Sequence, residues 1–401
     1  MRIFIEPTEP LLFRTGRPFT AGENTFAESI FPPTPETLQG ALRAAVAVHW
    51  GQKQIPPISG AGNLFQHPAL IELIGKRTDK GDTYGRFRIT GATLGRRNPA
   101  TRKIERLFPA PAHVIQATLK DETGRKFQQP ILLQPEEQTP GTTDITSDYA
   151  LLFPGLQGHK TAGKAEPLTG WLTSRGLMTV LQGNLPRESS EHLLKTDQIY
   201  VCEPRLGIGM QDEKKTTKEG YLYQVQMIRM QPGCGFVVDI AWGEERYGDA
   251  EMPPPDEQQT DSTPDLAFMR TGWLTLGGEQ RAAHFTVLEP QESAEEDGIS
   301  RVGSGNLLYF ATPAYFKQGW LPEDVALFPS HPLTAAINRY VPIGGWYLNL
   351  HNAGGGSKMM RRCVPAGSVY FFNEKITVNR PLTEYGWQIG YGITYTGEWK
   401  Q

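Results

Sequence analysis

Glycine and proline interrupt this chain so often that they decide what it can fold into. The 401 residues include 43 glycines and 32 prolines. Glycine adopts backbone conformations that other residues avoid, and proline is poorly tolerated inside helices and central strands. Both residues are therefore typical of turns. The sequence predicts short strands joined by many turns.

The length and composition indicate a globular protein of about two domains. The hydrophobic fraction is 38%, the mean hydropathy is -0.41 and the formal net charge is -3. A chain with this balance can bind nucleic acid only through local positive charge. The acidic, proline-rich segment 243–265 reads as a solvated insertion, and the acidic stretch 289–298 is the expected domain boundary.

Cysteine usage and the N-terminal sequence predict a cytoplasmic protein. The three cysteines, Cys202, Cys234 and Cys363, are far apart and form no CxxC motif, so neither a disulfide framework nor a cysteine zinc site is expected. The opening MRIFIEPTEP does not resemble a signal peptide. No apolar run approaches the ~20 residues that span a bilayer.

Local patterns place several elements. Residues 2–6 alternate as in a strand, and Thr34 and Pro35 are typical of a helix start. Apolar residues follow at helical spacing to Val46, which predicts an α+β domain.

Strand patterns dominate the second half of the chain. Residues 222–230 and 236–242 look like two strands of a hairpin. The last hundred residues form a second strand-rich unit, with a possible helix at 332–339.

Motifs of several enzyme classes are absent from the sequence. Gly75-Lys76 and Gly163-Lys164 lack the hydroxyl residue of a P-loop, and there is no HExxH or GxSxG motif. No carboxylate pair suggests acid–base chemistry. We expect no catalytic residues, no metal and no cofactor.

The segment LLFRTGRPF at 11–19 is the first candidate RNA-binding motif. Arg14 and Arg17 flank a glycine turn, and Phe13 and Phe19 stand beside them. Arginine pairs with phosphate through its planar fork, and an aromatic ring can stack on a base. The helix that follows presents free N–H groups at its start and carries Gly40 and Arg43 on its polar face. The alternative is that the phenylalanines are core and the arginines pair with Glu6 or Glu9.

Basic residues concentrate in a second segment, 86–106, which reads as a loop or hairpin. Its candidate phosphate ligands are Arg86, Arg88, Arg96, Arg97 and Arg102. The alternative is a solvated arginine face or a contact with an acidic protein.

Three further segments could contact RNA. A long hairpin at 205–223 would carry Lys214, Lys215 and Lys218 near its tip. Glycine turns admit a phosphate backbone at 274–281 and 390–399, and GGGSKMMRR at 354–362 adds flexible basic residues. The candidates in these turns are Gly277, Gly278, Arg281, Gly390, Gly392, Lys358, Arg361 and Arg362. Ordinary tight turns are the alternative for the glycine pairs.

The motifs together resemble one known family. PLLFRTGRPF, FPPTPETLQGALR, LGIGMQDEKKTTKEGYLY, LGGEQRAAHF and the closing GYGITYTGEW follow one another as in the subunit that holds the guide-RNA 5′ handle in type III-B (Cmr) CRISPR complexes. That subunit belongs to the repeat-associated mysterious protein (RAMP) superfamily. The resemblance runs from one end of the chain to the other.

The resemblance implies a fold and a role. It implies two ferredoxin-like (RRM-like) domains with long loop insertions, which we place at 1–290 and 299–401. It also implies a non-catalytic subunit that binds the crRNA 5′ handle and contacts the large polymerase-like subunit and a backbone subunit. By this resemblance, the residues expected to contact RNA are Arg14, Arg17, Gly40, Arg43, Gly277, Gly278, Arg281, Gly390 and Gly392.

Two other functions remain open. One is a repeat-cleaving ribonuclease of the same superfamily, which would need an acid–base pair. His159 beside Lys160 is the only candidate, and nothing in the sequence places a second group near it. The other is a scaffold whose basic loops face partner proteins.

Overall fold

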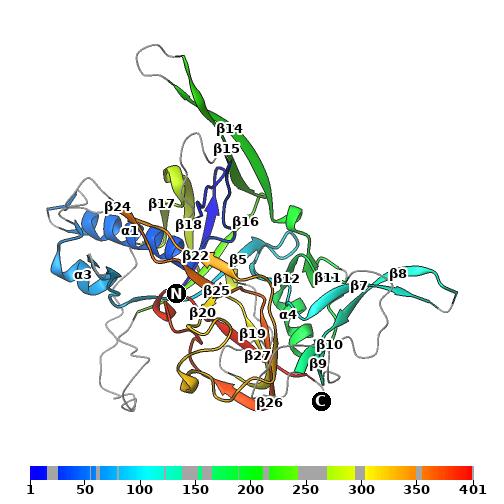
Figure 1. The fold of residues 1–401 in the computed structure, drawn as a ribbon. Coiled ribbons are helices and arrows are strands. Elements are labelled where there is room, and N and C mark those ends of the chain that lie inside the picture. The colour runs from blue at the N-terminus through cyan, green and yellow to red at the C-terminus, as the bar shows by residue number, and fades with distance from the viewer. Residues whose placement is uncertain are drawn as a thin grey trace.

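The computed structural model of the chain is a mixed α+β structure made mostly of strands, with three α-helices among the described residues (Figure 1). The residues it describes are 1–15, 26–54, 56–59, 64–78, 81–121, 123–137, 152–155, 165–187, 189–210, 216–242, 269–293, 303–348 and 355–399. The acidic insertion 243–265 therefore lies outside the described residues. No described helix is both long and apolar enough to cross a membrane.

An eight-stranded sheet organises the first part of the chain. Its order is β13-β12-β6-β5-β16-β1-β18-β17. The strands are β1 (Arg2–Pro7), β5 (Phe87–Arg97), β6 (Ile104–Pro109), β12 (Trp171–Thr173), β13 (Leu193–Leu194), β16 (Cys234–Trp242), β17 (Thr271–Thr275) and β18 (Ala282–Leu288). The predicted strand at 2–6 is confirmed and lies between β16 and β18, antiparallel to both.

Helix α1 (Pro35–Lys53) covers one face of this sheet. It begins at Pro35 after the N-cap residue Thr34, as predicted. Its apolar stripe, including Leu38, Leu42 and Val46, packs in one core with Ile3 and Ile5 of β1. Because successive strand residues point to opposite faces, Phe4 belongs to a separate cluster on the other side.

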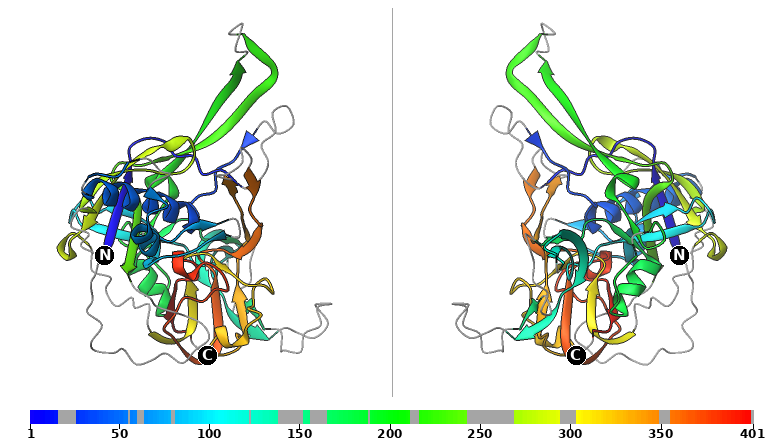
Figure 2. Two further views of the ribbon diagram at one scale, coloured as in Figure 1. Left: turned by 90° about the vertical axis from the view of Figure 1, so that its left-hand side faces the viewer. Right: turned by 90° about the vertical axis from the view of Figure 1, so that its right-hand side faces the viewer.

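The predicted hairpin of 222–230 and 236–242 is wrong. The first of these strands is part of β15 (Thr217–Met230), which pairs with β14 (Tyr200–Met210) and β2 (Phe26–Ala27). The second is β16, which pairs with β1 and β5. The turn at 231–233 therefore carries the chain from one sheet to another. The β14–β15 hairpin, predicted around 205–223, projects from the body of the molecule (Figures 1 and 2).

A second sheet forms in the last hundred residues, with the order β21-β26-β19-β27. Its strands are β19 (Gly303–Phe310), β21 (Thr334–Ala336), β26 (Val369–Val378) and β27 (Thr394–Gly397). The expected helix at 332–339 is wrong, because Thr334–Ala336 pair with Val369–Phe371 instead. Helix α4 (Ser174–Leu181) supplies the helical cover of this sheet: Leu177 packs with Leu307, Tyr309 and Phe371.

Shorter elements complete the fold. Helix α3 (Pro68–Ile74) contacts α1. The remaining strands are β3 (Arg77–Thr78), β4 (Gly81–Asp82), β7 (Val114–Lys120), β8 (Lys126–Leu132), β9 (Gln134–Glu137), β10 (Leu152–Gly155), β11 (Glu166–Pro167), β20 (Ala314–Tyr315), β22 (Val341–Ile343), β23 (Trp346–Leu348), β24 (Gly355–Ser357) and β25 (Arg361–Val364).

Candidate nucleic-acid interface

Three of the predicted motifs meet at the base of the β14–β15 hairpin. Leu11 exchanges two backbone hydrogen bonds of 2.8 Å with Ile228 of β15. The Ser29 hydroxyl donates to the Gln226 carbonyl at 2.6 Å and accepts from the Phe13 N–H at 3.3 Å. We call the segment Leu11–Arg14, Ser29, Gln226, Ile228 and the turn Gly277-Gly278 the junction.

The turn Gly277-Gly278 completes the junction from the side of β17. The Gly278 N–H donates to the Leu12 carbonyl at 2.7 Å. Gly277 has a φ of 78°, and a side chain there would place its Cβ 2.5 Å from the Leu12 oxygen. Only glycine fits this close approach. Gly277 thus lies close to the protein's own backbone at Leu12, although Gly277 itself is exposed.

Arg14 is the exposed cation of the junction. It forms an isolated antiparallel bridge with Ser29, and its side chain is exposed. Phe13, next to it, is 4% exposed and lies in the core that includes α1. The core alternative is therefore correct for Phe13. Arg17 and Phe19 lie outside the described residues.

Arg281, one of the predicted phosphate ligands, is engaged in ion pairs within the protein. Its guanidinium pairs with Glu9 at 2.8 Å and with Glu279. Glu9 also accepts the Ala282 N–H at 2.9 Å, and this bond, followed by Arg281, lowers the pKa of the Glu9 carboxyl. The positive charge of Arg281 is thus neutralised within the protein, where it ties the start of β18 to the segment after β1.

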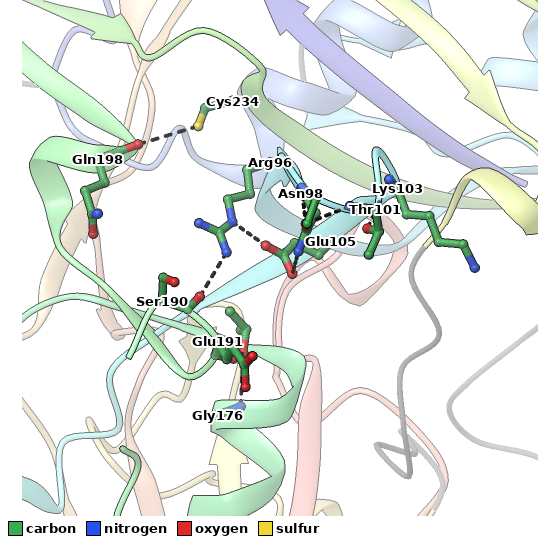
Figure 3. Close-up of polar contacts among 12 residues, drawn as sticks. Arg96, Asn98, Thr101, Lys103, Glu105, Gly176, Ser190, Glu191, Gln198 and Cys234 are labelled. Atoms are coloured by element: carbon green, nitrogen blue, oxygen red, sulfur yellow. Dashed lines mark hydrogen bonds and ion pairs between the residues drawn. The ribbon is translucent and has the colours of Figure 1, made fainter. Parts of the chain in front are cut away.

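The basic segment 86–106 is a hairpin, β5–β6, and its arginines mostly serve the protein. Arg96 pairs with Glu105 and donates to the Ser190 carbonyl at 3.0 Å (Figure 3). Arg88 donates to the Phe87 carbonyl at 3.2 Å and lies 5.8 Å from the Trp387 ring centroid. Arg97 lies over the Phe4 ring. These arginines are half-buried and make contacts within the protein, and phosphate contact by them stays a prediction.

The tip of the β5–β6 hairpin is exposed to solvent. Asn98 closes the turn by accepting the N–H groups of Ala100 and Thr101 at 2.9 and 3.1 Å. Arg102 is exposed there with a φ of 62°. Arg86, at the other end of the segment, is half-buried. Arg102 is therefore the candidate that the hairpin presents to solvent.

The two predicted residues on α1 have different surroundings. Gly40 is exposed, and a Cβ there would meet nothing within 4 Å. Arg43 is only 9% exposed and donates to the Gly75 carbonyl at 3.1 Å. Arg43 thus joins α1 to the end of α3, and its predicted place on the polar face is wrong.

Gly390 and Gly392 are buried, and their positive φ values serve internal turns. A Cβ on Gly390 would lie 3.0 Å from the Ile89 side chain, and one on Gly392 would lie 2.5 Å from the Leu382 oxygen. The tight-turn alternative is correct for both, because the close approach is made within the protein.

The remaining basic candidates lie on β15, on or just before β25, or outside the described residues. Lys214 and Lys215 lie outside the described residues, and Lys218 belongs to β15. Arg361 of β25 is half-buried with its guanidinium 3.7 Å from the Tyr385 ring centroid. Arg362 and the half-buried Lys358 lie at the surface.

Sequence reasoning missed the residues that hold the junction together. Ser29 and Gln226 are ordinary polar residues, and only the long-range pairing of their segments brings them together, so no local signal identifies them. Within the described part of the chain, no cluster of three metal-ligating side chains occurs. His159 lies outside that part.

Comparisons with known proteins identify the family. The family model described as CRISPR-associated protein (Cas_Cmr3) matches residues 3–399. No curated protein gives a significant match.

Solved structures of type III-B Cmr-beta complexes contain similar chains. One from a complex bound to cognate target RNA and AMPPnP has 17% identity and a TM-score of 0.45, covering 92% of this chain and 86% of that chain. One from the apo state has 11% identity and a TM-score of 0.30, covering 72% and 97%. Because the family model spans nearly the whole sequence, the chain belongs to the Cas_Cmr3 family of CRISPR-associated proteins.

Proposed function

We propose that the chain is the non-catalytic subunit of a type III-B CRISPR effector complex that binds the crRNA 5′ handle. The observation that carries the proposal is the junction, where an exposed arginine, a glycine turn and the base of a projecting hairpin meet in a member of this family. Cations there would neutralise phosphates, and the surrounding loops would read unstacked bases.

Strand order supports two ferredoxin-like domains, divided as predicted at 1–290 and 299–401. Such a domain is a βαββαβ unit whose first and third strands are central. In the order β5-β16-β1-β18, β1 and β16 are the first and third strands along the chain. In β21-β26-β19-β27, β19 and β26 hold the same positions. Both sets of neighbouring strands are antiparallel.

An apolar face on the β14–β15 hairpin supports docking on other subunits, which we take to be the large polymerase-like subunit and a backbone subunit. Leu206 is 75% exposed, and Ile208, Leu222 and Phe26 lie on the same face with 48%, 55% and 51% exposed. Large exposed apolar patches mark protein interfaces. The opposite face carries the ion pairs of Glu203 with Arg205 and Arg229.

The RNA-binding part is tested by reversing charge at the first motif. The double variant Arg14→Glu, Arg17→Glu should bind handle RNA more weakly, and its log affinity should fall less steeply with log salt, by roughly one unit per lost contact. Arg175→Glu, at an exposed pair with Glu191, is the matched control. Unchanged affinity and salt slope in the double variant would refute the assignment.

The ribonuclease alternative is tested separately. Incubation of the purified chain with its repeat RNA should leave the RNA intact. Cleavage that disappears in His159→Ala would replace the non-catalytic role with an enzymatic one.

A further inference from the structure

A small outward-facing surface around β25 combines an aromatic ring, cations and methionines. We call it the Tyr340 surface, formed by Arg339, Tyr340, Lys358, Met359, Met360 and Arg362. Tyr340 is 44% exposed, Met359 70% and Met360 45%. Arg339 and Arg362 are also exposed. An exposed tyrosine among exposed methionines and cations places a flat ring and positive charge together at the protein surface.

Strand pairing fixes the arrangement of this surface. Arg362 of β25 pairs with Pro342 of β22, two residues after Tyr340. Cys363, the next residue along β25, points into a buried cluster, so Arg362 points outward. Its guanidinium lies 5.3 Å from the Tyr340 ring centroid. The ring and the cation are therefore held together without a ligand.

The charges of the surface favour an anionic ligand. Within the described residues, no ion pair involves Arg339, Lys358 or Arg362. Some exposed cations elsewhere do pair, as in Arg175–Glu191, Lys317–Glu323 and Lys375–Glu398. Three cations without a paired carboxylate among the described residues thus lie on this one surface of a chain whose net charge is -3. Cations can neutralise phosphates, and an exposed aromatic ring beside them can stack on a flat ring, so a ligand that carries both groups fits this surface.

We propose that the Tyr340 surface binds single-stranded RNA, with an unstacked base on the Tyr340 ring and the flanking phosphates on Arg339 and Arg362. This inference rests on the proposed function, because the RNA is the one bound at the junction. It adds a base-stacking residue that the motifs did not reveal. The only sequence signal is the basic–aromatic pair Arg339-Tyr340.

A chain of contacts connects this surface with the start of α1. Arg361, beside Arg362 on β25, stacks on Tyr385, whose ring lies 5.6 Å from that of Tyr391. The Tyr391 hydroxyl donates to Glu36 in the first turn of α1. Ser29 of the junction precedes that turn by a few residues. Through these residues β25, which carries part of the Tyr340 surface, is packed against the start of α1, a few residues along the chain from the junction.

The test measures binding of the full chain to guide RNA with its 5′ handle, carrying 2-aminopurine at one handle position at a time. Tyr340→Ala should weaken binding by roughly 5- to 150-fold, the effect of losing one base–aromatic stack. Tyr340→Phe, which keeps the ring, should bind as the unaltered chain does. Arg362→Gln should weaken binding and reduce the salt slope by about one. Phe127→Ala, at a 41% exposed ring on β8, is the control and should have no effect.

One 2-aminopurine position should be quenched by the unaltered chain and by Tyr340→Phe, but not by Tyr340→Ala. Unchanged affinity and quenching in Tyr340→Ala, with Arg14→Glu, Arg17→Glu still impaired, would overturn this inference and leave the proposed function standing. Retained RNA binding with lost association of another Cmr subunit would also overturn it, in favour of a protein-docking surface. Handle-independent binding by the unaltered chain would instead contradict the proposed function itself.

Discussion

At the scale of single residues, a buried ion network explains why part of the arginine-rich segment 86–106 lies inside the fold. Arg106 is 2% exposed and pairs with Asp239, which also accepts from Arg2 at 2.9 Å. Asp239 lies on β16 between the strands that carry these two arginines. The ion network thus spans the four neighbouring strands β6, β5, β16 and β1, on the face opposite α1.

Asp239→Ala should destabilise the protein strongly. The change removes the carboxylate that pairs with the buried guanidinium of Arg106, and breaking a buried pair in this way costs about 3–5 kcal/mol. Glu191→Ala, at an exposed pair whose side chains are 61% and 71% exposed, should cost about 0–1 kcal/mol. Urea unfolding of both variants measures the difference. Equal losses would show that Arg106 gains little from its partner.

His113 should make the protein sensitive to mild acid. Burial lowers its pKa to about 3, whereas the unfolded chain takes up a proton at its ordinary pKa of about 6.5. The free energy of unfolding should therefore fall as the pH drops from about 6.5 towards 3, by up to roughly 1.4 kcal/mol per pH unit from this group. His113→Leu should flatten that part of the profile. An unchanged profile would show that His113 takes up a proton as readily in the folded protein as in the unfolded chain.

At the scale of elements, the β14–β15 hairpin has two chemically different faces. Leu206 and Ile208 alternate with residues of the charged face that carries Glu203 and Arg205. The hairpin projects away from both sheets (Figure 2), so its apolar face finds no cover within the described fold. Burial of that face by another subunit would remove apolar area from water.

Leu206→Asp with Ile208→Asp should leave the isolated chain stable and abolish its association with other Cmr subunits. Exposed side chains usually contribute within about 0.5 kcal/mol to folding, whereas a charge in a buried interface costs much more. Co-purification with the other subunits and thermal unfolding of the isolated chain separate the two effects. Val201→Asp on the opposite face is the control, and equal loss in both variants would contradict one-sided docking.

Elements whose residues show a clear local pattern could be predicted from the sequence. Elements that form by pairing with segments far away in the sequence could not. The Thr34-Pro35 start and the spacing of Leu38, Leu42 and Val46 predict α1 without tertiary information. The strand at Thr334–Ala336 depends on pairing with β26, which overrides its helix-like composition. The same holds for β15 and β16, whose pairing partners lie far away in sequence.

The sequence does not show which of the candidate site residues are buried. Arginines look alike in sequence, yet Arg14 is exposed whereas Arg43 is buried against the Gly75 carbonyl. Glycine pairs also look alike, yet Gly277 is exposed and Gly390 packs on Ile89. Composition can single out arginines and glycines as candidates, but only the fold separates those at the surface from those in the interior.

At the scale of the whole molecule, the two parts of the chain share a core. Helix α4 and Phe108 of β6 pack with Leu307 and Phe371 of the second sheet. The Tyr309 hydroxyl donates to the Pro109 carbonyl at 2.8 Å, and the Ala112 N–H donates to Gly367 at 2.7 Å. This shared core joins the part of the chain that carries the junction to the part that carries the Tyr340 surface.

The central claim is tested most directly by RNA binding of the purified chain at two salt concentrations, with guide RNA that carries or lacks its repeat-derived 5′ handle. The account predicts tighter binding to the RNA with the handle, without cleavage, and affinity that falls with salt. Equal or negligible binding to both RNAs would contradict it. Handle specificity would then belong to the assembled complex, and the chain would be a scaffold.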